Sequence, residues 1–146
     1  MTAIEYLEQA KNIDAKIKLG LRELTYWTEL ENSLRKNDIT EDLDYDVENP
    51  VARCMDISIK IEKEIVSEFG KIEKARHAVM DVIDRIDNSF YQQLLSLRYL
   101  YFCSWNEIAV ELKLDADKIH YYHILAVKEI EKVMPEENKK KHKTVI

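Results

Sequence analysis

Apolar residues recur at helical spacing along the first part of the chain. From Ala3 to about Lys36 there is no proline and a single glycine, Gly20, so nothing in this stretch forces a helix to end. The apolar positions are Ile4, Leu7, Ile13, Ile17, Leu21, Leu24, Trp27, Leu30 and Leu34. This pattern predicts one long amphipathic helix.

A second long helix is predicted from about Pro50 to Ile86. Residues 37–49, in front of it, lose the helical period and hold acidic and turn-forming side chains, which indicates a loop. Proline suits the first turn of the helix that follows. Along that helix, residues repeat at an interval of seven, and a second set follows three positions later: Val51, Ser58, Ile65, Ile72, Val79 and Ile86, then Cys54, Ile61, Ala75 and Val82. Such a seam predicts coiled-coil packing.

Residues 1–88 are therefore expected to form a long antiparallel helical hairpin. Each helix would extend on the order of 50 Å at roughly 1.5 Å per residue, and neither is stable alone. Apolar residues outside the seams indicate a second contact surface: Leu19, Trp27, Ile57, Ile59 and Phe69. Packing on the C-terminal domain is one way to cover them, and a homodimer, which we favour, is the other.

The last third of the chain has the pattern of three short helices. Ser104 and Glu107 have the spacing of a capping box and predict a helix start. A short turn follows that helix, and Asp115 is placed to cap the next one. The apolar positions of the three helices are Phe90, Leu94, Leu97, Leu100 and Tyr101; Trp105, Ile108, Ala109 and Leu112; and Ile119, Tyr122, Ala126, Val127 and Ile130. The chain is thus predicted to be all-α, with a trihelical helix-turn-helix domain over residues 89–134.

The segments LSLRYL, SWNEIAVEL and KIHYYHILAVKEI, in that order, resemble the region-4 helix-turn-helix of sigma factors. They are similar to the form carried by small phage late-transcription regulators of the ArpU/RinA type, including an alanine near the end of the recognition helix, which Ala126 matches. Those proteins also carry an N-terminal pair of long charged helices, so the resemblance covers most of the chain. It implies sequence-specific binding to phage promoter-region DNA, control of late transcription, and a place in the cytoplasm of the bacterial host.

In such a domain the helix that begins at Ala116 would lie in the major groove. The side chains expected to face DNA are Lys118, His120, Tyr121 and His123, and those nearer the backbone are Arg98, Lys113 and Lys128. Tyr121 stands where an arginine is expected, so this helix offers few basic groups. Tyrosine and histidine can hydrogen-bond to phosphates and bases. The alternative role is packing: Tyr122 has the spacing of the buried face, whereas Tyr121 fits either role.

Charge is distributed unevenly along the chain. The sequence holds 22 basic and 28 acidic side chains, a net of −6, which is not typical of a nonspecific nucleic-acid binder. Residues 89–146 hold 9 basic and 8 acidic side chains, a net of +1, which leaves 13 and 20, a net of −7, for residues 1–88. The basic tail, residues 135–146, contains the run from Lys139 to Lys143 and is either a cationic arm for phosphates or a solubilising end.

Little in the sequence indicates enzyme chemistry, a metal or a cofactor. Asp117, His120 and His123 make at most part of a metal site, because no cysteine or glutamate completes it locally. The acidic loop lacks the glycine and the terminal glutamate of a calcium loop, but its charge and the sigma-like resemblance make it a candidate contact for RNA polymerase. Cys54 and Cys103 have apolar neighbours and are expected to be reduced core residues.

Two classes of function stay open. The first is a DNA-binding transcription regulator of phage origin that dimerises through the hairpin. The second is a protein-protein interaction module that acts on RNA polymerase or a phage assembly partner without binding DNA, and the charge-poor recognition helix favours it. The sequence has no pattern of a membrane segment or signal peptide, so we expect no membrane partner, and we expect no enzyme activity.

Overall fold

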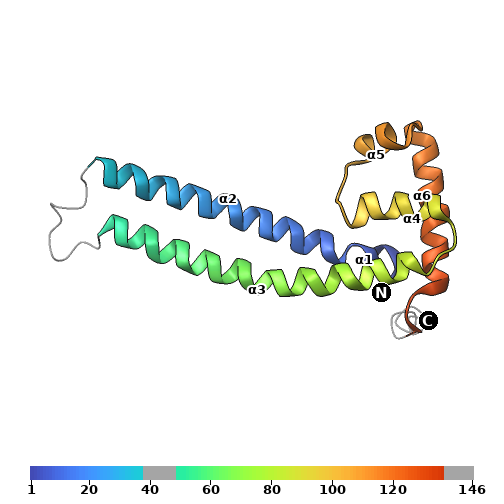
Figure 1. Ribbon diagram of the computed structural model, residues 1–146, viewed down its shortest axis with the longest axis horizontal. Coiled ribbons are helices and arrows are strands. Elements are labelled where there is room, and N and C mark those ends of the chain that lie inside the picture. Colours follow the sequence, from blue (N-terminus) through green and yellow to red (C-terminus); the bar gives the residue numbers. More distant parts are fainter. Residues whose placement is uncertain (38–48, 137–146) are drawn as a thin grey trace. The chain divides into compact units, whose positions relative to one another are not determined.

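The computed structural model describes residues 1–37 and 49–136, and in these residues all regular structure is helical (Figure 1). The helices are α1 (Ala3–Leu7), α2 (Gln9–Lys36), α3 (Pro50–Asp84), α4 (Ser89–Tyr99), α5 (Trp105–Leu112) and α6 (Ala116–Val133). The expected all-α fold class is confirmed, with a long helical hairpin followed by a trihelical helix-turn-helix. Most of the predicted acidic loop and the lysine run of the basic tail lie outside the described residues.

The long N-terminal helix that the sequence predicts is interrupted at Glu8. The Thr2 side chain caps α1 by accepting the Glu5 N–H at 3.1 Å, and α1 ends after five residues. At Glu8 the ψ angle is −2°, far from its usual α-helical value. The Gln9 side chain donates to the Tyr6 carbonyl at 2.7 Å and so supplies a partner for a group at the helix end. The break therefore rests on a side-chain bond that helical periodicity does not reveal.

Helices α2 and α3 lie side by side and run in opposite directions through the compact unit of residues 13–71 (Figure 1). Lys16 of α2 lies 3.5 Å from Glu68 of α3. Gly20 lies so close to α3 that a Cβ at this position would be 3.1 Å from the Ile65 side chain. The seam predicted on α3 is confirmed here, because its members are buried or half-buried: Val51, Cys54, Ser58, Ile61 and Ile65.

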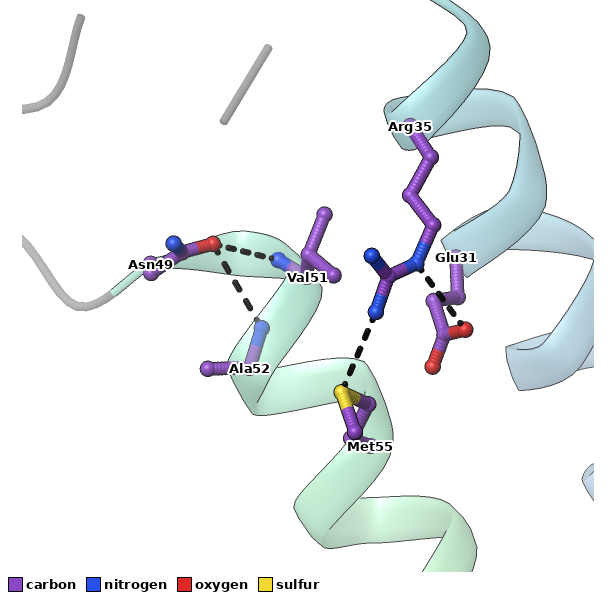
Figure 2. Close-up of polar contacts among 6 residues, drawn as sticks. All are labelled: Glu31, Arg35, Asn49, Val51, Ala52 and Met55. Atoms are coloured by element: carbon purple, nitrogen blue, oxygen red, sulfur yellow. Dashed lines mark hydrogen bonds and ion pairs between the residues drawn. The ribbon is translucent and has the colours of Figure 1, made fainter. Parts of the chain in front are cut away.

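Helix α3 begins with Pro50 in its first turn, as the sequence predicts, and with a side-chain cap that the sequence analysis did not include. The side-chain oxygen of Asn49 accepts the backbone N–H of Val51 at 2.9 Å and that of Ala52 at 3.4 Å (Figure 2). Pro50 takes the first helical position, where an N–H has no partner within the helix and its loss costs nothing. Local chemistry therefore sets the start of α3.

The other compact unit joins residues 1–12 to the described residues from Ile72 onward. Its core is formed by α1, the last turns of α3, α4 and α6, and the fully buried side chains include Leu7, Val79, Val82, Ile83, Leu95, Ala126 and Ile130. This division differs from the boundary at residue 88 that the sequence suggests. The physical reason is that α1 and the end of α3 bury their apolar residues in one cluster with α4 and α6.

Helices α4, α5 and α6 enclose a second core cluster. Leu94, Ile108 and Ile119, one from each helix, are fully buried. The partly buried side chains packed around them are Phe90, Leu97, Cys103, Trp105, Ala109, Leu112, Leu114 and Tyr122. Because each helix is short, this shared cluster is what holds the helix-turn-helix together.

The caps predicted at the starts of α5 and α6, on either side of the turn that joins these helices, are both confirmed. The Ser104 hydroxyl accepts the Glu107 N–H at 3.2 Å, and the Asp115 carboxylate accepts the Lys118 N–H at 2.8 Å. Lys113 ends α5 in the left-handed conformation, with φ 57° and ψ 43°. Glycine is the usual residue at such a position. The turn therefore forms without glycine, at the cost of a strained lysine.

Both cysteines pack against apolar neighbours, as predicted. Cys54 is buried in the seam of α3, Cys103 is half-buried beside the cluster of the helix-turn-helix, and both are free thiols. Burial raises the pKa of the Cys103 thiol, and the nearby carboxylates of Glu107 and Glu111 add to the effect. A thiol with a raised pKa stays protonated and is a poor nucleophile.

We predict that Lys113→Gly stabilises the protein. A residue with a Cβ loses about 1 kcal/mol or more in the left-handed conformation, and glycine loses little, so the free energy of unfolding should rise by about 0.5–1 kcal/mol. Urea denaturation measures the change. Lys113→Ala removes the same charge but keeps the strain, so it is the matched control. A glycine variant no more stable than the alanine variant contradicts the prediction.

Candidate nucleic-acid interface

Helix α6 has one buried face and one exposed face. Its buried residues are Ile119, His123, Ala126, Val127 and Ile130. The exposed residues between Ala116 and Lys128 are Asp117, Lys118, His120, Tyr121, Ile124 and Lys128. The spacing of three and four residues places His120, Tyr121, Ile124 and Lys128 along one stripe of the helix. The exposed face of α6 thus brings together four of the residues predicted to contact DNA, which are Lys118, His120, Tyr121 and Lys128.

Helix α5 adds a mixed surface to this region. Its exposed side chains are Asn106, Glu107, Val110 and Glu111, and Lys113 is exposed in the turn that follows. Residues 89–136 hold five basic and seven acidic side chains, a net of −2. The lysines that make the C-terminal part of the chain basic, residues 139–143, lie outside the described residues. Lys113, Lys118 and Lys128 therefore carry the positive charge of the described interface.

The expectation that His123 faces DNA is wrong. Its side chain is 8% exposed and belongs to the buried face of α6. The Tyr99 hydroxyl lies 2.7 Å from its Nε2 atom, and the Trp105 ring meets its ring edge-on at 4.7 Å between centroids. The signal was present in the sequence, because His123 follows Ile119 by four residues and precedes Ala126 by three. Because histidine is polar, it was not counted among the apolar positions of the buried face.

Burial governs the ionisation of this pair. Burial, with smaller contributions from the charges of His120 and Arg98, lowers the pKa of His123 from 6.5 to about 4. Burial also raises the pKa of the Tyr99 hydroxyl to about 12, with a contribution from Glu8. At neutral pH a neutral imidazole therefore meets a protonated hydroxyl, and each can satisfy the other. The pair is part of the core and offers nothing to a ligand at the surface.

Arg98 is held by contacts within the helix-turn-helix. Its guanidinium lies 4.3 Å from the centre of the Trp105 ring and donates to the Cys103 carbonyl at 3.1 Å. A stacked guanidinium with a backbone acceptor is well anchored. Arg98 therefore joins α4 to the start of α5, and of the three residues expected near the DNA backbone, Lys113 and Lys128 are the exposed ones.

The two adjacent tyrosines have different surroundings. Tyr122 is half-buried, and its ring meets that of Phe90 edge-on at 5.2 Å between centroids, so the packing role predicted for it is confirmed. Tyr121 is 59% exposed and touches the Tyr122 ring with its own at 5.5 Å between centroids. Tyr121 thus presents its hydroxyl on the exposed stripe. Ile124 on the same stripe and Val110 on α5 are exposed apolar residues that the sequence analysis did not single out.

The described part of the chain does not assemble a metal site. Among residues 1–37 and 49–136, no group of three or more His, Cys, Asp or Glu side chains is placed to hold an ion. His120 and His123 point to different surroundings, one exposed and the other buried. No helix in these residues combines the length and the apolar composition that crossing a membrane requires.

We predict that stability falls as the pH drops from about 6.5 to about 4. The pKa of His123 is about 4 in the folded protein and near 6.5 when unfolded, so protonation favours the unfolded chain, and the full stability is present above pH 6.5. The loss should be on the order of 2 kcal/mol after allowing for screening by solvent. Urea denaturation at a series of pH values measures it. His123→Gln cannot titrate, and a variant profile as steep as that of the wild type contradicts the prediction.

Comparison with known proteins adds no relative to this description. The resemblance to sigma region 4 therefore stays a prediction from the motifs of the chain. No family model, curated protein or solved structure matches the chain.

Proposed function

We propose that the protein is a sequence-specific DNA-binding transcription regulator, encoded by a phage or prophage and controlling late genes in the cytoplasm of its bacterial host. The observation that carries the proposal is the geometry of α5 and α6. Each helix has its own side-chain cap, a short turn joins them, and both pack on α4. One face of the first half of α6 is left exposed, as a helix that enters a major groove requires.

The exposed groups of α6 suit both kinds of DNA contact. Lys118 and Lys128 can pair with phosphates, while Tyr121 and His120 can hydrogen-bond to base edges. Ile124 lies between them and suits the methyl group of a thymine. Asp117, at the start of the helix, can accept from a cytosine amino group but repels phosphate. The stripe therefore favours reading of bases over general attraction to the backbone.

The small positive charge of the described interface limits the affinity expected for DNA. Three lysines on the described interface would release few counterions, so one copy would bind weakly and with a shallow dependence on salt. A homodimer would present two α6 helices to two half-sites and combine their affinities. We therefore include dimerisation, with the hairpin as its means, in the proposed function.

We predict that Lys118→Glu combined with Lys128→Glu abolishes DNA binding, with at least about a hundredfold loss of affinity, because two phosphate contacts become repulsions. Binding to fragments from the genome region that encodes the protein is measured by fluorescence anisotropy at two salt concentrations, against unrelated competitor DNA. Lys36→Glu with Lys74→Glu changes the net charge equally on exposed residues outside α5 and α6 and should leave binding unchanged. Equal loss in both double variants would show that the exposed face of α6 is not the DNA-binding surface.

The alternative function is a protein-protein interaction module that acts on RNA polymerase or a phage assembly partner. The net charge of −2 over residues 89–136 and the exposed apolar side chains of Val110 and Ile124 favour it. On this alternative, the folded wild-type protein does not bind DNA even at low salt, and the lysine variants keep their protein partner. Saturable, competitor-resistant binding of DNA that weakens as salt rises would rule it out.

A further inference from the structure

A stripe of exposed apolar residues runs along α3 on a face other than its seam. Val66 and Phe69 are 72% and 61% exposed, and Met55 and Ile59 are more than two-fifths exposed. With Glu62 between them, the stripe steps by four, three, four and three residues, which is the spacing of a second coiled-coil seam. Within residues 13–71 the described apolar side chains that are fully buried are Val51 and Cys54, and most of the seam is half-buried.

Gly70 lies at the end of this stripe and is not explained by packing within the chain. A Cβ at Gly70 would meet no atom within 4 Å, whereas one at Gly20 would lie 3.1 Å from Ile65. Gly20 is therefore small because α3 passes close to it. Glycine is a poor helix former, and the space beside Gly70 is open to whatever packs on the stripe from outside.

The two sides of the hairpin differ in character. On one side, Lys16 and Lys71 both pair with Glu68, at 3.5 and 3.2 Å. The groove on α2 and α3 is lined there by charged side chains that include Glu23, Arg53, Lys60 and Glu64. On the other side, Arg35 of α2 reaches across to the Met55 sulfur at 3.3 Å (Figure 2). The apolar stripe thus lies away from the charged groove, with Arg35 contacting it at Met55 and Glu62 as its charged member.

We propose that a second copy of this chain covers the stripe, with the two α3 helices packed antiparallel about a two-fold axis between Glu62 and Lys63. Within the stripe, Ile59 and Val66 are related by that axis, and Phe69 would lie level with Asp56 of the other copy. Ile59 and the partner's Val66 are equally distant from the axis, as are Met55 and the partner's Gly70. The side chain of Met55 would then fill the open space that the glycine leaves. In a two-fold interface every such contact occurs twice.

The charged residues at the proposed axis also favour a second copy of this chain as the molecule that covers the stripe. Glu62 of one copy would lie opposite Lys63 of the other, and Lys63 opposite Glu62, so both exposed charges at the axis are paired. The apolar stripe exposes on the order of 500 Å² in each copy, which is comparable to the largest apolar patch of a typical monomer, a patch that is often a contact site, and is enough for the core of a modest interface. A different protein would need its own matching pattern, whereas this chain already carries its complement.

This inference rests on the dimer included in the proposed function, but not on DNA binding. The oligomeric state of the protein therefore tests it without DNA. Sedimentation equilibrium from about 1 µM to about 1 mM should show a monomer-dimer equilibrium for the wild type. Val66→Glu should weaken the dimer at least about tenfold, since it places two charges in the interface. Tyr26→Glu, an equally charged change at an exposed aromatic residue of α2 outside the stripe, should not.

Charge reversal tests the two-fold register. Glu62→Lys should weaken the dimer because two like pairs form at the axis, and Glu62→Lys combined with Lys63→Glu should restore it. Neighbouring residues in a helix do not face each other, so the restoration has to come from the second copy. Gly70→Leu should raise the melting temperature of dilute, monomeric protein and yet weaken the dimer, because leucine favours the helix but fills the space of the partner's Met55.

Three outcomes overturn the proposal. They are a wild type that stays monomeric up to about 1 mM, a dimer unaffected by Val66→Glu, and a charge-reversed pair that does not restore the dimer weakened by Glu62→Lys. Failure of the proposed function looks different. In that case the wild type dimerises as described and binds no DNA at low salt.

Discussion

The fold depends on one face of α6, which carries two buried clusters in succession. Its first turns bring Ile119 against Leu94 and Ile108, and its later turns bring Ala126 and Ile130 into the core with α1 and the end of α3. Because one helix serves both clusters, it cannot rotate about its axis without exposing both. This constraint selects the side chains that face solvent, and it makes the exposed stripe of α6 as well positioned as the core beneath it.

A polar pair lies where the two clusters meet. His123 is between Ile119 and Ala126 on the buried face, and Tyr99 of α4 reaches it with its hydroxyl. Burying either group alone is costly, whereas together they satisfy each other. Arg98 and Trp105 pack beside them and connect α4 to the start of α5. The orientation of the helix-turn-helix is thus set by hydrogen bonds and stacking as well as by apolar contact.

The two compact units differ in what holds them together. The unit containing α6 encloses fully buried side chains from α1, α3, α4, α5 and α6, and apolar burial stabilises it directly. The hairpin of residues 13–71 relies on a seam of mostly half-buried residues, such as Ile61 and Ile65, with Gly20 allowing the close approach of its helices. A long hairpin with one seam has little stability to spare. Its surface chemistry therefore matters more for its stability than does that of the other unit.

The sequence predicted the helix caps of the helix-turn-helix and the seam of α3 correctly, because both depend on residues close together in the chain. A cap acts within one turn, so Ser104 and Asp115 predict the starts of α5 and α6, and Pro50 favours the first turn of α3. The seam of α3 is visible in the sequence because its period is regular. Two features needed the folded chain: the burial of His123 and the joining of α1 to the core of α6. The break at Glu8 was missed for another reason, because the local bond from Gln9 to Tyr6 does not alter the periodicity. Periodicity identifies the residues that share a helical face, but the distant helix that covers the face is set by packing between segments far apart in the sequence.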